Sequence, residues 1–304
     1  MPDTPQPFVV TCHGWSASNW LAWALNRHPD IACGHSSAGI LATDAAIFDG
    51  EGLARHIPRL REGYVQRGSR PLTDLYRDLA AQKPASHVGT VHTYRLRDLA
   101  TQAGLIGPQR QRIPVVNLIR HPLDLVVSGH GQFCDLFRID LNEFSWTLRK
   151  VVEQGLEITE RICARHGIDP GDYDIVCFFG ACVVLGSLKA DFDAEAAVSP
   201  AGPWSLLGHV RMEDLTRDPA ELARLVDQLT GQDRLATPDY LAEIYRLGRI
   251  NVHNRTAAEG TGRRWDALAG WQRDAFAAFL DLFDLRPAYE RLGYDFDFME
   301  NGHG

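Results

Sequence analysis

Short apolar, β-branched runs alternate with helical periodicities along the chain. The runs are bounded by polar residues and predict buried strands at residues 8–12, 88–91, 115–119 and 208–212. Apolar residues at helical spacing predict helices at 19–26, 123–137, 143–166, 220–230, 238–247 and 265–283. Strands that alternate with helices predict an α/β protein, with a parallel sheet flanked by helices and a helix-rich C-terminal extension.

The organisation along the chain predicts a single domain over residues 1–304. No internal repeat and no linker rich in Pro, Gly and Ser interrupts it. The longest uncharged, mostly apolar run, residues 175–188, is too short to cross a bilayer and predicts a buried element. The N-terminal residues show no signal peptide. We therefore expect a cytoplasmic protein without a membrane span.

Composition narrows the function classes. Hydrophobic residues make up 45% and charged residues 23% of the 304 residues, which excludes a disordered or fibrous protein. Six scattered cysteines without a CxxC pair predict reduced, buried thiols and no zinc site. The net charge of -8 argues against nucleic-acid binding. The net charge is +3 over residues 1–150 and -11 over residues 151–304, which favours an anionic small ligand on the first half.

The loop HGWSASNW follows the first predicted strand and opens a helix. A loop in this position aims backbone N–H groups and the positive end of the helix at one point, which suits phosphate or sulfate. Ser16 and Ser18 add hydroxyl donors, and the small residues Gly14 and Ala17 allow a ligand close to the backbone. The loop lacks the G-K-[ST] ending of a Walker A motif. The alternative is an ordinary turn in which Ser18 is the N-cap.

A second candidate anion site lies in VVNLIRHPLDLVVSGHGQF. Arg120 ends the predicted strand, where its guanidinium is suited to bidentate phosphate binding. Ser128 lies about two turns into the following helix, and Asp124 between them is suited to holding the local geometry. The alternative is a surface ion pair between Arg120 and Asp124.

Together these two segments resemble the PAPS-dependent sulfotransferases. HGWSASNWLAWALNRHPDI is similar to the family's 5′-phosphosulfate loop, P-[KR]-S-G-T-T-W followed by a helix and H-P. RHPLDLVVS is similar to its 3′-phosphate motif, R-[ND]-P-x-D-x-x-x-S. The resemblance implies a P-loop NTPase-like sulfotransferase fold and PAPS as donor, with PAP as product. It assigns cofactor binding to Gly14, Trp15, Ser16, Ala17, Ser18, Asn19, Trp20, Arg120 and Ser128.

Two further segments resemble the family. EGTGRRWDAL is similar to a Gly-rich basic loop that closes over the 3′-phosphate, which adds Arg263 and Arg264 to the cofactor-binding residues. Their alternative is a solvated basic loop before a helix. GTVHTYRL places His92 where the cytosolic members have K-T-H, and the resemblance makes His92 the catalytic base that deprotonates the acceptor. The alternatives are a structural role for His92 and a base at His35.

The sequence departs from the family at two basic positions. Trp15 and Thr90 stand where the family has basic residues around the bridging oxygen of the donor. His13 and Arg95 are the nearby groups that would compensate. These departures put the catalytic assignment in question and leave donor binding intact.

The function that follows is transfer of a sulfuryl group from PAPS to a hydroxyl or amine of a small-molecule, carbohydrate or lipid acceptor. The expected partners are this small-molecule acceptor and no nucleic acid. No metal is implied, and a homodimer is compatible with the sequence. The alternatives are a non-catalytic PAP- or nucleotide-binding protein of the same fold and a P-loop kinase-like phosphoryl transferase.

Overall fold

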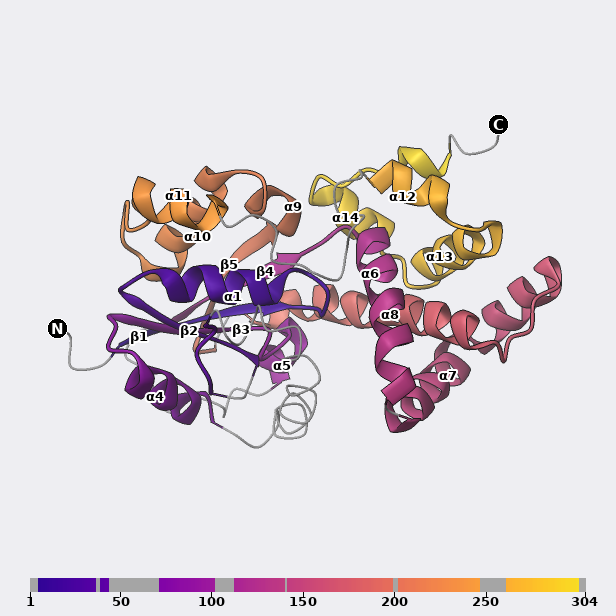
Figure 1. Cartoon of the computed structure of the whole chain (residues 1–304), viewed down its shortest axis with the longest axis horizontal. Coiled ribbons are helices and arrows are strands. Elements are labelled where there is room, and N and C mark those ends of the chain that lie inside the picture. Colours follow the sequence, from indigo (N-terminus) through magenta and orange to yellow (C-terminus); the bar gives the residue numbers. More distant parts are fainter. Residues whose placement is uncertain are drawn as a thin grey trace. The chain divides into compact units, whose positions relative to one another are not determined.

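The computed structural model describes residues 5–36, 39–43, 71–101, 112–139, 141–198, 202–246 and 261–300 of the chain. The chain forms two compact units (Figure 1). The first unit comprises Met1–Ile119 and Asp193–Asn251, and the second comprises Arg120–Phe192 and Val252–Gly304. Each unit is therefore assembled from two separate stretches of sequence. A single domain over residues 1–304 stays a prediction.

A five-stranded parallel sheet forms the centre of the first unit, which confirms the predicted α/β class. Its strands are β1 (Gln6–Cys12), β2 (Ile31–His35), β3 (His87–Val91), β4 (Ile113–Ile119) and β5 (Trp204–Arg211). They lie in the order β2-β3-β1-β4-β5. The strands predicted at 8–12, 88–91 and 115–119 are confirmed, and the one at 208–212 begins four residues earlier. β2 is not among the predicted strands.

Alternating side chains of the sheet pack against helices on both faces. Phe8, Val10 and Cys12 of β1 join the cluster on one face, and Val9 joins the cluster on the other. The first face is covered by α1 (Ser18–Arg27), α10 (Pro219–Thr230) and α11 (Pro238–Arg246), and α9 (Met212–Leu215) follows β5 (Figure 1). The second face is covered by α4 (Leu72–Gln82) and α5 (Leu96–Thr101). Both clusters contain fully buried aliphatic and aromatic side chains, which is the burial expected of a doubly covered parallel sheet.

A bulge in β5 sets the register of the last strand pair. Val115 pairs with Leu206, but Val116 pairs with Gly208, so Leu207 is the extra residue. Gly208 has a φ of 131°, which side chains other than glycine rarely accept. Because of this bulge, His209 lies opposite Asn117 of β4.

The second unit is helical. It contains α6 (Pro122–Ile139), α7 (Leu141–His166), most of α8 (Tyr173–Val198), α12 (Thr261–Ala267), α13 (Gly270–Leu282), α14 (Arg286–Arg291) and the 3-10 helix η3 (Asp297–Met299). The helices predicted at 123–137 and 143–166 are confirmed. The single helix predicted at 265–283 is wrong, because Leu268 and Ala269 separate α12 from α13.

The apolar run 175–188 lies inside α8, which is longer than the run itself. By length and composition alone this 26-residue helix is able to cross a membrane. However, 67% of its most apolar window is buried inside the protein, as in the core helix of a globular unit. The predicted buried element is confirmed.

Candidate functional site

The loop between β1 and α1 has the backbone geometry of an anion-binding turn. Trp15 and Ala17 take left-handed φ angles of 68° and 53°. Left-handed residues within a turn curve successive backbone N–H groups into a concavity that suits an anion. A Cβ atom added to Gly14 would meet nothing within 4 Å, so the space beside this residue is open. Helix α1 begins directly after the loop and adds its positive end.

The two serines of this loop differ in their partners. The Ser16 side chain is 1% exposed, and its Oγ has no hydrogen-bond partner among the described residues. The Ser18 Oγ lies 3.0 Å from Nε2 of His35. Ala17, and not Ser18, is the N-cap of α1, so the alternative reading of Ser18 as a simple N-cap is wrong. A buried, unsatisfied hydroxyl costs about 1–3 kcal/mol unless a ligand satisfies it, and this fits an oxyanion.

His92 follows β3 in an environment that fixes its tautomer. Its Nδ1 lies 3.2 Å from the carbonyl oxygen of Cys12 and 3.3 Å from the Cys12 thiol. The carbonyl is the stronger acceptor, so we assign the proton to Nδ1, which places the basic lone pair on Nε2. The ring stacks on His35, with centroids 5.4 Å apart and planes 18° from parallel. His92 is thus linked through His35 to Ser18 of the loop.

Residues with strained, left-handed backbone angles lie at the carboxyl ends of three neighbouring strands. Trp15 and Ala17 follow β1, Ser36 follows β2 and His92 follows β3, and all four have positive φ angles. Non-glycine residues pay about 1 kcal/mol or more for this conformation, and such strain clusters at functional sites. Thr93 Oγ1 donates to the Ser36 carbonyl oxygen at 2.8 Å, which fixes one of these strained turns.

The order of the strands also indicates a ligand-binding site at the carboxyl ends of the strands. The chain leaves β1 towards β2 and leaves β4 towards β5, so the connections diverge where β1 and β4 lie side by side. Open α/β sheets bind ligands outside the carboxyl ends of strands at such a point. The loop after β1 is at this end.

A row of hydrogen-bonded polar side chains that the sequence pattern does not predict lies near these strand ends. Thr11 Oγ1 donates to Asn117 Oδ1 at 2.9 Å, and Asn117 Nδ2 lies 3.1 Å from His209 Nδ1. His209 Nε2 in turn lies 3.2 Å from the Glu195 carboxylate. The available signal was an asparagine inside the apolar strand VVNLI. The sequence gives His35 only as a rival base, because β2, the strand that carries it, is not among the predicted strands.

The second predicted anion site lies in the second unit. Arg120 directly follows β4 and is 4% exposed, and Ser128 is half-buried on α6. The Asp124 carboxylate pairs with Arg264 of α12 at 2.5 Å and accepts from the Thr261 hydroxyl at 3.5 Å. The pair buries both charges, because Arg264 is 7% and Asp124 is 6% exposed. Asp124 thus fixes α12 against α6.

The basic loop expected around Arg263 and Arg264 is a helix where the structure describes it. Residues 259–260, with which this segment begins, lie outside the described residues, and α12 begins at Thr261. Arg263 is exposed on this helix and Arg264 is buried. The expectation of a loop at Arg263 and Arg264 is therefore wrong, because the two residues continue the helical turn that carries Trp265 into the core.

The remaining cofactor candidates lie on α1. Asn19 is exposed on the first turn, and Trp20 is buried. The Trp20 ring packs edge-on against Tyr245, with centroids 6.1 Å apart. Its contact with adenine stays a prediction, since the Trp20 side chain is packed in the hydrophobic core of the first unit.

The Cys33 thiol, in the middle of β2, is disfavoured as a nucleophile. Burial raises the pKa of the Cys33 thiol far above its ordinary value. The thiol therefore stays protonated near neutral pH, and the nucleophile of thiol chemistry is the thiolate. The chemistry available here is anion binding beside an imidazole base.

Comparisons with known proteins add little to this picture. No protein-family model matches the chain, and no curated protein matches it. Among solved structures, the sulfotransferase domain from the curacin biosynthetic pathway matches at 15% sequence identity, with a TM-score of 0.37. The match covers 82% of this chain and 81% of that chain. Similarity at this level carries no conclusion about activity, so the assignment of function depends on the residues themselves.

Proposed function

We propose that this chain is a sulfotransferase that uses PAPS and a small-molecule, carbohydrate or lipid acceptor with a hydroxyl or amine group. The observation that carries the proposal is the buried Ser16 hydroxyl, without a partner among the described residues, in a left-handed turn at the start of α1. This arrangement suits the phosphosulfate end of the donor. The resemblance of the loop sequence to the family's 5′-phosphosulfate loop supports the same ligand.

The residues have separate roles in this proposal. The donor supplies a sulfuryl group, whose bond to the phosphate oxygen breaks as its bond to the acceptor forms. Ser16 and the backbone N–H groups of the loop bind the negatively charged oxygens and neutralise charge as it develops. Nε2 of His92 accepts the proton that the acceptor loses. His35 orients Ser18 and, through ring stacking, His92.

Arg120 and Ser128 are proposed to bind the 3′-phosphate, as the sequence motif implies. Arg264 is the weaker candidate, because its charge is already paired with Asp124. Removing the guanidinium of Arg120 would delete a charge-assisted contact worth about 1.5–3 kcal/mol, or roughly 10–150-fold in affinity.

The test compares PAP with adenosine 5′-phosphosulfate, which lacks the 3′-phosphate, by calorimetric titration. We expect Arg120→Ala to weaken PAP binding by roughly 10–150-fold and to change binding of the second ligand little. Arg161→Ala, an exposed arginine of α7, is the control and should change neither. Equal losses for both ligands would make Arg120 a structural residue. Turnover is then measured with labelled PAPS against a panel of acceptors.

A non-catalytic nucleotide-binding protein is the second candidate, and the observation that favours it is the pair Trp15 and Thr90. The Thr90 hydroxyl lies 3.3 Å from the Ser36 carbonyl oxygen, so it serves the local turn and brings no positive charge. Tight PAP binding with no transfer to any acceptor of the panel would support this candidate over the enzyme.

A further inference from the structure

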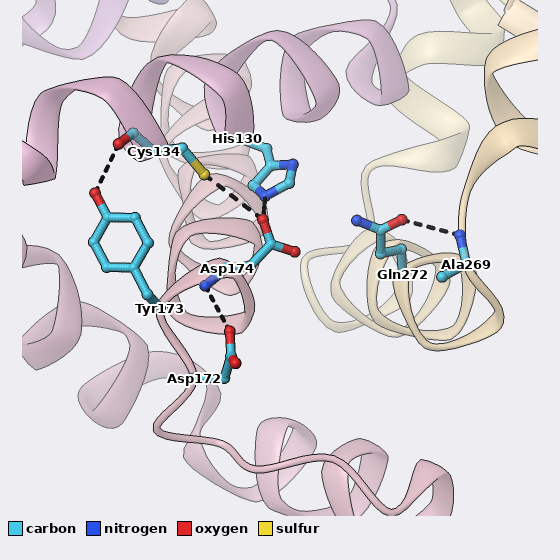
Figure 2. Close-up of polar contacts among 7 residues, drawn as sticks. All are labelled: His130, Cys134, Asp172, Tyr173, Asp174, Ala269 and Gln272. Atoms are coloured by element: carbon cyan, nitrogen blue, oxygen red, sulfur yellow. Dashed lines mark hydrogen bonds and ion pairs between the residues drawn. The ribbon is translucent and has the colours of Figure 1, made fainter.

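Four side chains with metal-binding atoms gather between α6 and α8 in the second unit. His130 and Cys134 are one turn apart on α6, and Asp174 and Cys177 are one turn apart at the start of α8. Residues at these spacings share one face of a helix. Figure 2 shows His130, Cys134 and Asp174 pointing towards one another.

The distances within this cluster are short. His130 Nε2 lies 2.8 Å from Asp174 Oδ1, and the Cys134 thiol lies 3.8 Å from the same oxygen. The three candidate ligand atoms are all within 4.8 Å of one another. The Cys177 thiol lies beside the Cys134 thiol, outside the set of three mutually close atoms, and is the candidate for a fourth ligand.

We propose that His130, Cys134, Asp174 and Cys177 bind one zinc ion that joins α6 to α8. Thiolate, imidazole and carboxylate are the ligands that zinc takes in tetrahedral sites. With zinc at about 2.0–2.3 Å from each ligand, neighbouring ligand atoms are about 3.3–3.8 Å apart. The Cys134 thiol is already at this spacing from Asp174, and His130 Nε2 and Asp174 Oδ1 need to move apart by about 0.5 Å. Cys177 must turn towards the ion, and the metal replaces the hydrogen bond between His130 and Asp174.

Neighbouring groups hold these ligands in place. The Tyr173 hydroxyl donates to the carbonyl oxygen of Cys134 at 2.7 Å, and the backbone N–H of Asp174 donates to the Asp172 carboxylate at 2.9 Å (Figure 2). The Phe178 ring contacts the His130 ring edge-on, with centroids 5.3 Å apart. Supporting groups of this kind orient metal ligands and raise affinity.

Burial divides the cluster into an inner and an outer part. Cys177 is fully buried, whereas the Asp174 side chain is 56% exposed and leaves a path for an ion. Burial raises the pKa of both thiols, so the metal-free protein holds them protonated and binding releases protons. The proposed role is to stabilise this unit, because all four positions of a tetrahedral site are taken by protein ligands.

The proposal departs from the expectation of no metal, which the absence of a CxxC pair suggested. The ligands are instead distributed as H-x-x-x-C and D-x-x-C over two helices. Only the pairing of α6 with α8 brings them together.

The experiment uses the full-length chain, stripped of metal with a chelator under reducing conditions and titrated with Co²⁺ as a spectroscopic probe for zinc. We expect one Co²⁺ per chain, with a thiolate-to-metal charge-transfer band and the intense visible bands of tetrahedral cobalt. Added Zn²⁺ should displace the cobalt and remove these bands. Zinc is then counted by elemental analysis of the reloaded protein.

Cys134→Ser and His130→Ala test the ligands, and Cys163→Ser is the control. Cys163 is a buried cysteine of α7 outside the cluster. Both ligand variants should lose at least the roughly 10–100-fold in affinity that even a supporting residue contributes. The control should bind like the wild type.

Three results would overturn the proposal. The first is a wild-type chain that is folded by circular dichroism but binds neither Co²⁺ nor Zn²⁺. The second is cobalt uptake without a charge-transfer band, or with the same affinity in Cys134→Ser. The third is a chain purified without reductant that carries a Cys134–Cys177 disulfide, identified by peptide mass, and takes up no metal after reduction.

Discussion

Burial of the Ser16 hydroxyl lowers the stability of the unliganded protein. Because the hydroxyl has no partner among the described residues, Ser16→Ala should raise the free energy of unfolding by about 1 kcal/mol. The same change should weaken PAPS binding about 5- to 10-fold, because one donor to the anion is lost. Denaturant unfolding and calorimetric titration measure the two effects.

Ser18→Ala is the matched control for that variant. Ser18 has a partner in His35, so its removal should lower the free energy of unfolding by about 1 kcal/mol. A Ser16→Ala chain that is destabilised like Ser18→Ala would contradict the assignment of Ser16 to a ligand.

His92 combines a strained backbone with a proposed catalytic role. His92→Asn keeps a residue that tolerates the left-handed conformation and removes the basic nitrogen. We expect kcat for sulfuryl transfer to fall by about 10²–10⁴-fold, with PAP affinity and the melting temperature nearly unchanged. Steady-state kinetics on an acceptor found in the panel measures this loss. Retention of most activity would move the base to another group, with His35 as the first candidate.

At the scale of elements, β1 and β3 are in close contact at one glycine. A Cβ atom at Gly89 would lie 2.1 Å from the Phe8 ring, which is fully buried. The ring cannot withdraw, because α1 and the rest of the cluster surround it. Gly89→Ala should therefore lower the free energy of unfolding by about 2–4 kcal/mol in urea titration.

Gly202→Ala provides the comparison for Gly89→Ala in the same unit. Its added Cβ would meet Trp204 at 3.5 Å, an ordinary van der Waals distance. We expect a change within about 0.5 kcal/mol. A loss for Gly89→Ala as small as the one for Gly202→Ala would mean that Phe8 accommodates the extra methyl group.

The elements differ in how visible they are in the sequence. β1, β3 and β4 are apolar or β-branched runs, and their pattern is local. β2 reads IACGH and is buried because its neighbours enclose it: a Cβ at Gly34 would lie 2.9 Å from both Leu79 and the Ile40 carbonyl oxygen. Helix α8 is apolar around much of its circumference, so no 3.6-residue stripe shows in its sequence.

In the candidate site, too, the features with a local sequence pattern were predictable and those set by distant residues were not. The loop after β1 was predictable, because its residues are contiguous and its small and hydroxyl-bearing residues are typical of anion sites. The contact between Ser18 and His35, and the stacking of His35 on His92, depend on the order of three strands that are distant in sequence. Such contacts are set by the pairing of strands, which local pattern does not determine.

At the scale of the whole molecule, the two units alternate along the chain. The first unit needs residues from both sides of the stretch Arg120–Phe192. A chain that ends at residue 192 lacks β5, α10 and α11, so β4 loses a strand partner and one face of the sheet loses its cover. We expect this chain to aggregate or to show no cooperative urea transition.

A chain that ends at residue 251 is the comparison for that truncation. It keeps both segments of the first unit. We expect a cooperative transition and native-like strand content by circular dichroism. The same outcome for the shorter chain would show that β5 and its helices are dispensable.

The alternation also has a consequence during synthesis of the protein. β4 ends at Ile119 and its partner β5 begins at Trp204, about 85 residues later. At roughly 5–20 residues per second, a ribosome takes about 4–17 s to deliver the missing strand. Throughout that interval the edge of β4 presents unpaired N–H and C=O groups to solvent or to other nascent chains. The time between the two strands, rather than the final stability, is then the period in which a chaperone has most to protect.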